Sequence, residues 1–236
     1  MSVRPAAIAR ACPTGTPNRS NVPSLGRLLQ KGLLSLWLLT SVVVSIGLTV
    51  LLSRTGIDAA VNQFARLQDP TLSVTWSAFP MLAGFAVPVL IPLVCAARGR
   101  KETAKATLAA FLVALILVSV LKALTSRLHP EALVPISVLA KSQTFSFGFL
   151  QAGLMSVVEG WPSGHVATNA AVSIVLARRT KHAWIATSCW IWLAWVTLAT
   201  TFGISGDVHW LSDSLAGLLI AVAIALRLAP AETLQR

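Results

Sequence analysis

Charged residues are scarce in this chain, and acidic residues are the scarcest of them. Only 11% of the 236 residues are Asp, Glu, Lys or Arg, whereas these four types make up about a quarter of a soluble domain. The chain is 55% hydrophobic, and its mean hydropathy is +0.74. This balance excludes an ordinary soluble domain and predicts an integral membrane protein with one helical domain.

Cysteine is also rare, and its placement excludes a cysteine-based framework. The three cysteines, Cys12, Cys95 and Cys189, are far apart and show neither metal-site nor disulfide spacing. Cys95 and Cys189 fall in or beside apolar stretches, which predicts small buried side chains.

Six apolar stretches predict the spanning helices. They cover residues 33–52, 75–97, 106–124, 164–177, 183–203 and 210–229. We therefore expect residues 28–236 to form an all-α domain of six transmembrane helices. The second stretch contains Pro80, Pro88 and Pro92, which a spanning helix tolerates when neighbouring helices satisfy the freed backbone groups. The fourth stretch is short and spans only if every residue from 163 to 178 is counted.

The net charge of +11 would suit a nucleic-acid partner, but its distribution indicates membrane topology. With the N-terminus inside, fourteen basic and two acidic residues lie on the inner side, a balance of +12, and five basic and six acidic residues lie outside, a balance of −1. This is the positive-inside pattern. We expect a bacterial inner-membrane protein with both termini cytoplasmic and no nucleic-acid partner. Residues 1–27, which contain no acid, are predicted to be a disordered basic cytosolic tail.

The first motif begins the fourth apolar stretch and reads Pro162, Ser163, Gly164, His165. Serine is a good helix N-cap, and glycine lets a ligand approach the backbone closely. The free N–H groups and the helix dipole favour an anion such as phosphate. His165, in the first turn, is placed to donate a proton to a departing oxygen. An ordinary capped helix with a chance histidine explains these four residues equally well.

The second motif begins the sixth stretch and contains His209 and Asp213. Residues four apart share a helix face, so the carboxylate can hold one ring nitrogen and leave the other to attack. A structural hydrogen bond between the two is the simpler alternative. A zinc site made by His165, His209 and Asp213 has no fourth ligand at a suitable spacing. We therefore expect no metal and no other cofactor.

A third group of polar residues ends the third stretch on the same outer side. Lys122 suits a phosphate as a point charge, although a lysine there also reaches the membrane interface without any ligand. Arg127 and His129 follow in a short polar loop.

Together these motifs resemble the type 2 phosphatidic acid phosphatase family, the PAP2 membrane phosphatases. The family motifs are KxxxxxxRP, PSGH and SRxxxxxHxxxD. The first begins here at Lys122 and closes at Pro130, the second is complete at 162–165, and the third keeps His209 and Asp213. The resemblance covers roughly residues 75–225 and agrees with six spans and an outward site.

The resemblance implies a role for each matching residue. His209 would take the phosphoryl group as a phosphohistidine, Asp213 would orient it, and His165 would protonate the leaving group. Phosphate oxygens would be bound by Lys122, Ser163 and Gly164. The substrate would be a membrane lipid phosphate or diphosphate, such as undecaprenyl diphosphate, phosphatidylglycerophosphate or phosphatidic acid, that enters from the outer, periplasmic leaflet.

Both arginines of the family pattern are absent. His129 stands where the first is expected, and Phe202 and Gly203 replace the serine and arginine of the third motif. We expect Arg127 to reach the phosphate as a substitute, and His129 to act as a cation at low pH. A lipid phosphatase with an altered phosphate pocket is the leading hypothesis. A lipid phosphotransferase and a catalytically impaired lipid-binding membrane protein are the alternatives.

Overall fold

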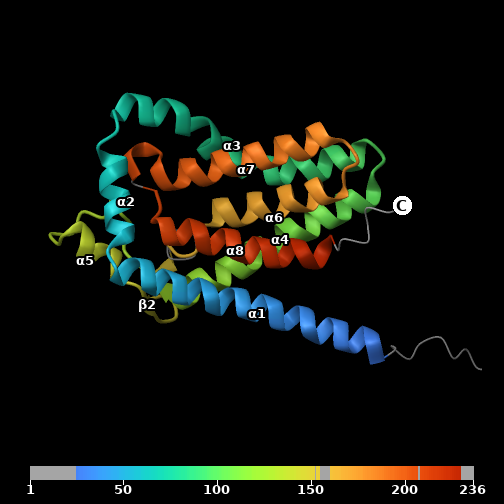
Figure 1. Cartoon of the computed structure of the whole chain (residues 1–236), viewed down its shortest axis with the longest axis horizontal. Coiled ribbons are helices and arrows are strands. Elements are labelled where there is room, and N and C mark those ends of the chain that lie inside the picture. Colours follow the sequence, from blue (N-terminus) through green and yellow to red (C-terminus); the bar gives the residue numbers. More distant parts are fainter. Residues whose placement is uncertain (1–24, 152, 155–159, 207, 230–236) are drawn as a thin grey trace, which may run out of the picture.

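The computed structural model describes residues 25–151, 153–154, 160–206 and 208–229. Six helices run along the bundle (Figure 1): α1 (Leu25–Arg54), α3 (Pro70–Ala97), α4 (Lys101–Leu124), α6 (Gly164–Arg179), α7 (Ala183–Phe202) and α8 (Leu211–Leu228). The shorter elements are α2 (Ile57–Arg66), α5 (Val138–Ser142), the 3₁₀ turn η3 (Ile204–Gly206), and the strands β1 (Thr125–Ser126) and β2 (Ser146–Phe147), which pair antiparallel. The all-α prediction is confirmed.

The predicted number of six spans is not confirmed, because α6 differs from the other five long helices. Those five are long and apolar enough to cross a membrane. Helix α6 has 16 residues, which cover roughly 24 Å at 1.5 Å per residue, less than the ~30 Å hydrocarbon core. Every residue from Val166 to Val175 is buried. Because protein encloses α6, it needs no apolar face and carries Thr168, Asn169 and Ser173 in its interior turns.

Small residues allow the helices to pack closely around α6. Ala106, Ala110 and Ala114 form a stripe along α4, and Ala170 and Ala171 belong to the same core cluster on α6. Stripes of small residues let helix backbones approach each other, which gives close van der Waals packing where the surrounding lipid offers no hydrophobic driving force.

Two of the three prolines inside α3, Pro80 and Pro88, are accommodated by side chains of neighbouring helices. A proline lacks an N–H, so it leaves the carbonyl four residues earlier without its helical donor. The carbonyl freed by Pro80 is that of Trp76, which accepts a hydrogen bond from Trp195 Nε1 at 3.1 Å. The carbonyl freed by Pro88 is that of Gly84, which accepts from Asn169 Nδ2 at 2.8 Å. These two bonds bear out the expectation that adjacent helices satisfy the interrupted backbone.

The elements at one end of the bundle include a helix that the sequence analysis missed. Figure 1 shows α2 crossing the bundle at the end where α5 also lies, while the first described residues of α1 and the end of α8 lie at the opposite end. One face of α2 is buried, with Asp58 and Asn62, whereas Phe64 is exposed. At ten residues, α2 is too short to stand out as an apolar stretch.

Two smaller expectations concern the tail and the cysteines. Helix α1 begins at Leu25, so the last three residues of the predicted tail are helical, and residues 1–24 lie outside the described chain. Cys95 and Cys189 are buried and free, as their apolar surroundings indicated, and Cys12 also lies outside the described residues.

Candidate active site

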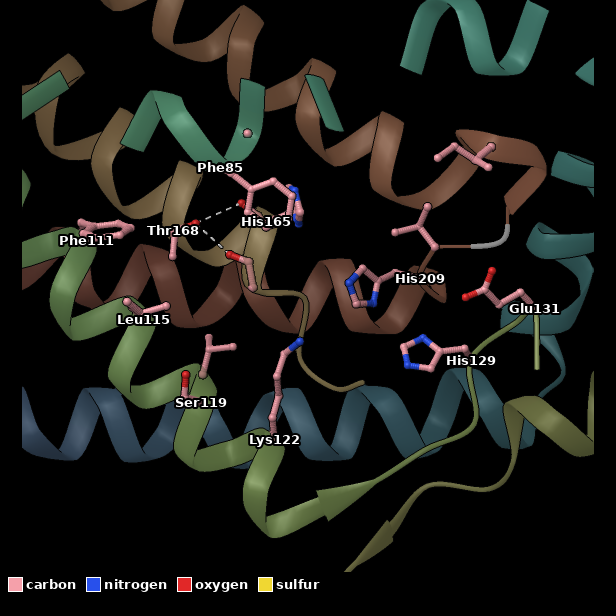
Figure 2. A pocket seen from close by; sticks show the side chains of 15 residues that line it. Phe85, Phe111, Leu115, Ser119, Lys122, His129, Glu131, His165, Thr168 and His209 are labelled. Carbon is pink, nitrogen blue, oxygen red and sulfur yellow. Dashed lines mark hydrogen bonds between the residues drawn. The ribbon is translucent and has the colours of Figure 1, made fainter. Parts of the chain in front are cut away.

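A cavity of about 660 Å³ opens among α3, α4, α6 and the segment that precedes α8. Figure 2 shows that its labelled polar side chains converge from different elements. The polar part is lined by Lys122, His129, Glu131, Gly164, His165 and His209, and the apolar part by Phe85, Phe111, Leu115 and Val118. Three histidines and a lysine that are far apart in the sequence therefore share one cavity.

The turn before α6 links the two histidine motifs. Ser163 is the N-cap of α6, and its Oγ accepts a hydrogen bond from Val166 N at 3.4 Å. The backbone N–H of Ser163 donates to Asp213 O at 3.0 Å. A side-chain carbon on Gly217 would lie only 2.6 Å from Ser163 O, so a glycine on α8 is required for this approach. Ser163 itself is fully buried and does not line the cavity, whereas Gly164 does.

His165 lies on the other side of His209 from His129 in the view of Figure 2. Its Nε2 is 3.0 Å from Met81 O on α3, and because a carbonyl only accepts, Nε2 carries the hydrogen of this bond. The ring lies edge-on to Phe85, with centroids 4.0 Å apart. A side-chain carbon on Gly84 would be 2.9 Å from the ring. Glycine at position 84 therefore makes room for the imidazole beside α3.

His209 is held just before α8 begins. Its Nδ1 lies 3.5 Å from Asp213 Oδ2, and both side chains are buried. The other contact of Oδ2 is a hydrogen bond from Trp210 N at 3.2 Å. The two residues therefore meet across the start of the helix rather than along a helical face. Burial is the main cause that lowers the pKa of His209 to about 4, and the charge of Lys122 acts in the same direction, while Asp213 opposes it.

Lys122 and His129 approach the cavity from α4 and from the loop after β1. Lys122 is buried although it is a lysine, with 4% of its surface exposed. Figure 2 shows its amine directed toward the start of α6, between His165 and His209. The rings of His129 and His209 have centroids 6.4 Å apart. Glu131, which the sequence analysis did not single out, lines the same part of the cavity.

Arg127 lies outside the residues that line the cavity. Its guanidinium is buried and pairs with Asp58 Oδ2 at 2.6 Å and with Asp213 Oδ1 at 2.5 Å. The expected substitute for the missing arginines is therefore directed away from the phosphate end, toward acids on α2 and α8. Asp58 was missed because it lies far from every motif, and only its place in a short amphipathic stretch distinguishes it in the sequence.

The position of the second missing arginine has no room for a side chain. A carbon added to Gly203 would lie 2.3 Å from Ala199 O, 2.4 Å from Ser77 Cβ and 2.7 Å from Ser77 Oγ. Ser77 is buried on α3, so α3 and the end of α7 meet where the family pattern places an arginine. A longer side chain at position 203 would therefore require α3 and the end of α7 to separate.

The zinc alternative of the sequence analysis finds no support among the described residues. Within that part of the chain, no group of three or more His, Cys, Asp or Glu side chains is arranged to hold a metal ion.

Comparison with known proteins places this site in a family. The model of the PAP2 superfamily matches residues 103–233, which is more than half of the 236 residues. Neither a curated protein nor a solved structure matches the chain. The match includes Lys122, His165, His209 and Asp213, whereas Asp58 and α3 precede it. The chain belongs to the PAP2 superfamily, whose members are phosphatase-type enzymes acting on phosphate esters.

Proposed function

We propose that the protein hydrolyses a membrane lipid phosphate or diphosphate through a phosphohistidine formed on His209. The observation that carries this proposal is the composition of the cavity. Lys122, His129 and His209 lie toward one side of the cavity in Figure 2, Phe111 and Leu115 lie toward the other, and His165 lies beside Phe85 between them. A phosphate with an attached apolar chain matches both sides.

His209 is suited to be the nucleophile. Its Nδ1 faces Asp213, so a proton on Nδ1 leaves the lone pair of Nε2 for attack. With a pKa lowered to about 4, the ring is neutral at neutral pH and this lone pair is available. Nε2 forms a bond to phosphorus while the bond from phosphorus to the lipid or phosphate oxygen breaks. Asp213 then stabilises the positive charge that the ring gains.

His165 is suited to protonate the leaving oxygen. Because Nε2 of His165 is hydrogen-bonded to Met81 O, Nδ1 is the ring nitrogen that exchanges a proton with the substrate. In the second step, water attacks the phosphohistidine, His165 accepts the proton of that water, and inorganic phosphate leaves with His209 restored.

Phosphate binding at this site relies on Lys122 and the start of α6. The first N–H groups of a helix have no partner within it and favour an anion. Gly164 presents this end of α6 to the cavity. Lys122 adds a buried positive charge, and His129 lines the same part of the cavity. Ser163 supports the same end as the N-cap that holds the turn.

The apolar part of the cavity supports a lipid substrate. Phe111, Leu115, Val118 and Lys122 follow one face of α4, so the cavity runs about 16 Å along the helix at 1.5 Å per residue. Phe85 is 69% exposed and Leu115 is 43% exposed, which opens this part toward the surrounding bilayer. A single hydrocarbon chain entering sideways between α3 and α4 fits this shape.

We place the site on the outer, periplasmic side of a bacterial inner membrane. The end opposite the site carries the turn between α3 and α4, with Arg98, Arg100 and Lys101, and the end of α6, with Arg178 and Arg179. By the positive-inside rule this end is cytoplasmic. The start of α1 and the end of α8 lie there as well (Figure 1), which supports the proposal that both termini are cytoplasmic.

The test is phosphate release by purified protein in detergent from a panel of phosphatidic acid, phosphatidylglycerophosphate and undecaprenyl diphosphate. We expect His209→Ala to abolish release and His182→Ala to retain it. His182 is a matched control because it is the exposed N-cap residue of α7, far from the cavity. Equal release by wild type and His209→Ala would contradict the mechanism. Transfer of the phosphoryl group to a second lipid, without release of free phosphate, would instead identify a phosphotransferase. Lipid binding without turnover would identify a lipid-binding protein.

A further inference from the structure

A buried cluster of charges lies behind His209, and Asp213 is its one member with a role in the mechanism as described so far. It consists of Asp58 on α2, Arg127 after β1, and Ser212 and Asp213 in the first turn of α8. Asp58 and Ser212 have no exposed surface, and Arg127 is 6% exposed. Buried charges are costly unless they are paired and hydrogen-bonded, so the pairing within this cluster calls for a functional explanation.

All five N–H donors of Arg127 are directed at protein acceptors. Nε donates to Ser142 O at 3.2 Å, and Nη2 donates to the same carbonyl at 2.8 Å and to Asp58 Oδ2 at 2.6 Å. Nη1 donates to Ser212 Oγ at 2.7 Å and to Asp213 Oδ1 at 2.5 Å. A guanidinium has five such donors, so none remains for a substrate phosphate.

Asp58 is bound from several directions, which holds it beside the guanidinium. Its Oδ1 accepts from Ser212 N at 3.0 Å, and its Oδ2 accepts from Ser212 Oγ at 2.6 Å in addition to Arg127. A residue on α2 therefore caps the first turn of α8, the same turn that carries Asp213. The pairs place one guanidinium between two carboxylates, and this group of three keeps a net charge of −1.

The two oxygens of Asp213 are divided between different partners. Oδ1 is bound by Arg127, and Oδ2 faces His209 Nδ1 at 3.5 Å. An arginine paired with Asp213 alone would neutralise the carboxylate and weaken its effect on the imidazole. With Asp58 on its other side, the guanidinium is already balanced, so the charge of Asp213 remains effective at the ring.

We propose that Asp58 is a positioning residue for the nucleophile: acting through Arg127, it balances the guanidinium so that Asp213 keeps the negative charge that stabilises phosphorylated His209. The inference rests on the proposed function of His209. It adds a residue that lies outside the family match of 103–233, and it assigns Arg127 to the support of Asp213 instead of to the phosphate.

The test compares two changes within the cluster. Asp58→Asn keeps the shape of the side chain and removes its charge, whereas Ser212→Ala removes the hydroxyl that donates to Asp58 Oδ2 and accepts from Arg127 Nη1, and it leaves all charges in place. We expect Asp58→Asn to lower kcat by about tenfold or more with KM little changed, as for groups that orient a functional histidine. Ser212→Ala is expected to keep kcat within about threefold, because Arg127 stays paired with both carboxylates and Asp213 keeps its charge.

The double variant Asp58→Asn with Arg127→Gln separates charge from packing. It restores the net charge of −1, so we expect its kcat to exceed that of Asp58→Asn, a non-additive result that loss of packing does not produce. If Asp58→Asn does not fold, the double variant is compared with wild type, and a kcat within about threefold at a similar melting temperature supports the inference.

The outcomes that would overturn this inference differ from those that would overturn the proposed function. If wild type releases phosphate and Asp58→Asn has an unchanged kcat, or if the folded double variant is slower than the single variant, the role of Asp58 is wrong. If wild type releases no phosphate from any lipid in the panel, the proposed function itself fails.

Discussion

The same substitution at Gly164 and at Gly217 is expected to have opposite consequences. Gly164 begins α6 and Gly217 lies inside α8. An alanine carbon at Gly217 would be 2.6 Å from Ser163 O, whereas one at Gly164 would meet Val118 at 3.7 Å and Lys122 at 4.0 Å. The first distance requires two backbones to separate, and the second distances are ordinary contacts.

The magnitudes follow from these contacts. The contact at position 217 is 0.8 Å shorter than the 3.4 Å at which ordinary contact begins. Overpacking of this kind costs about 1–3 kcal/mol, and the higher helix propensity of alanine offsets up to about 1 kcal/mol. Because the atom that the new carbon meets is backbone, we take the upper end of this cost, about 3 kcal/mol less about 1 kcal/mol. We therefore expect Gly217→Ala to lose about 2 kcal/mol, which is a fall in melting temperature of roughly 4–8 °C for a chain of this size.

Gly164→Ala is expected to keep the melting temperature and to lose turnover. Its added carbon is directed toward Lys122, in the space that the proposed phosphate occupies. The measurements are thermal unfolding of purified protein in detergent and phosphate release from the best lipid substrate. The reasoning is refuted if Gly164→Ala is destabilised as much as Gly217→Ala, or if Gly164→Ala retains full activity.

Four other changes test separate parts of the structure. Gly203→Arg is expected to lower the yield of folded protein and to leave activity unimproved, because the new side chain collides with Ser77; higher phosphate release would show that the position is open. The pKa of His209 is lowered to about 4, so between about pH 6.5 and 4 the unfolded chain binds a proton that the folded chain does not. Stability in melting experiments should therefore decrease as the pH falls through this window, and His209→Gln should reduce the decrease; an unchanged slope would contradict burial of a neutral ring. Asn169→Leu removes the donor to the carbonyl freed by Pro88, and the unsatisfied group should cost about 1–3 kcal/mol in thermal unfolding; a wild-type melting temperature would argue against that bond. Leu115→Trp should raise KM for long-chain lipid phosphates and leave KM for short-chain analogues unchanged, because the indole narrows the apolar part of the cavity. An equal change in KM for both kinds of substrate would show that the hydrocarbon chain of the lipid does not bind along Leu115.

The spanning helices and the motif histidines could be predicted from the sequence because both depend on local pattern. The apolar stretches correspond to α1, α3, α4, α6, α7 and α8, although α6 is enclosed by protein and falls short of a full span. The prolines in α3 indicated where backbone carbonyls are freed, but not that Trp195 and Asn169 would bind them. Those partners come from other helices, and no pattern along one segment specifies them.

The sequence by itself determined the membrane class, the PAP2 motifs and five of the residues that line the cavity, which are Lys122, His129, Gly164, His165 and His209. These follow from hydropathy, from charge distribution and from the short spacing of motif residues near the start of a single helix. Only the tertiary structure decided that Arg127 faces Asp58 and Asp213 instead of the cavity, and that Ser77 fills the place of the arginine missing at Gly203. Both depend on contacts between residues far apart in the chain, where burial and charge pairing determine the direction of a side chain.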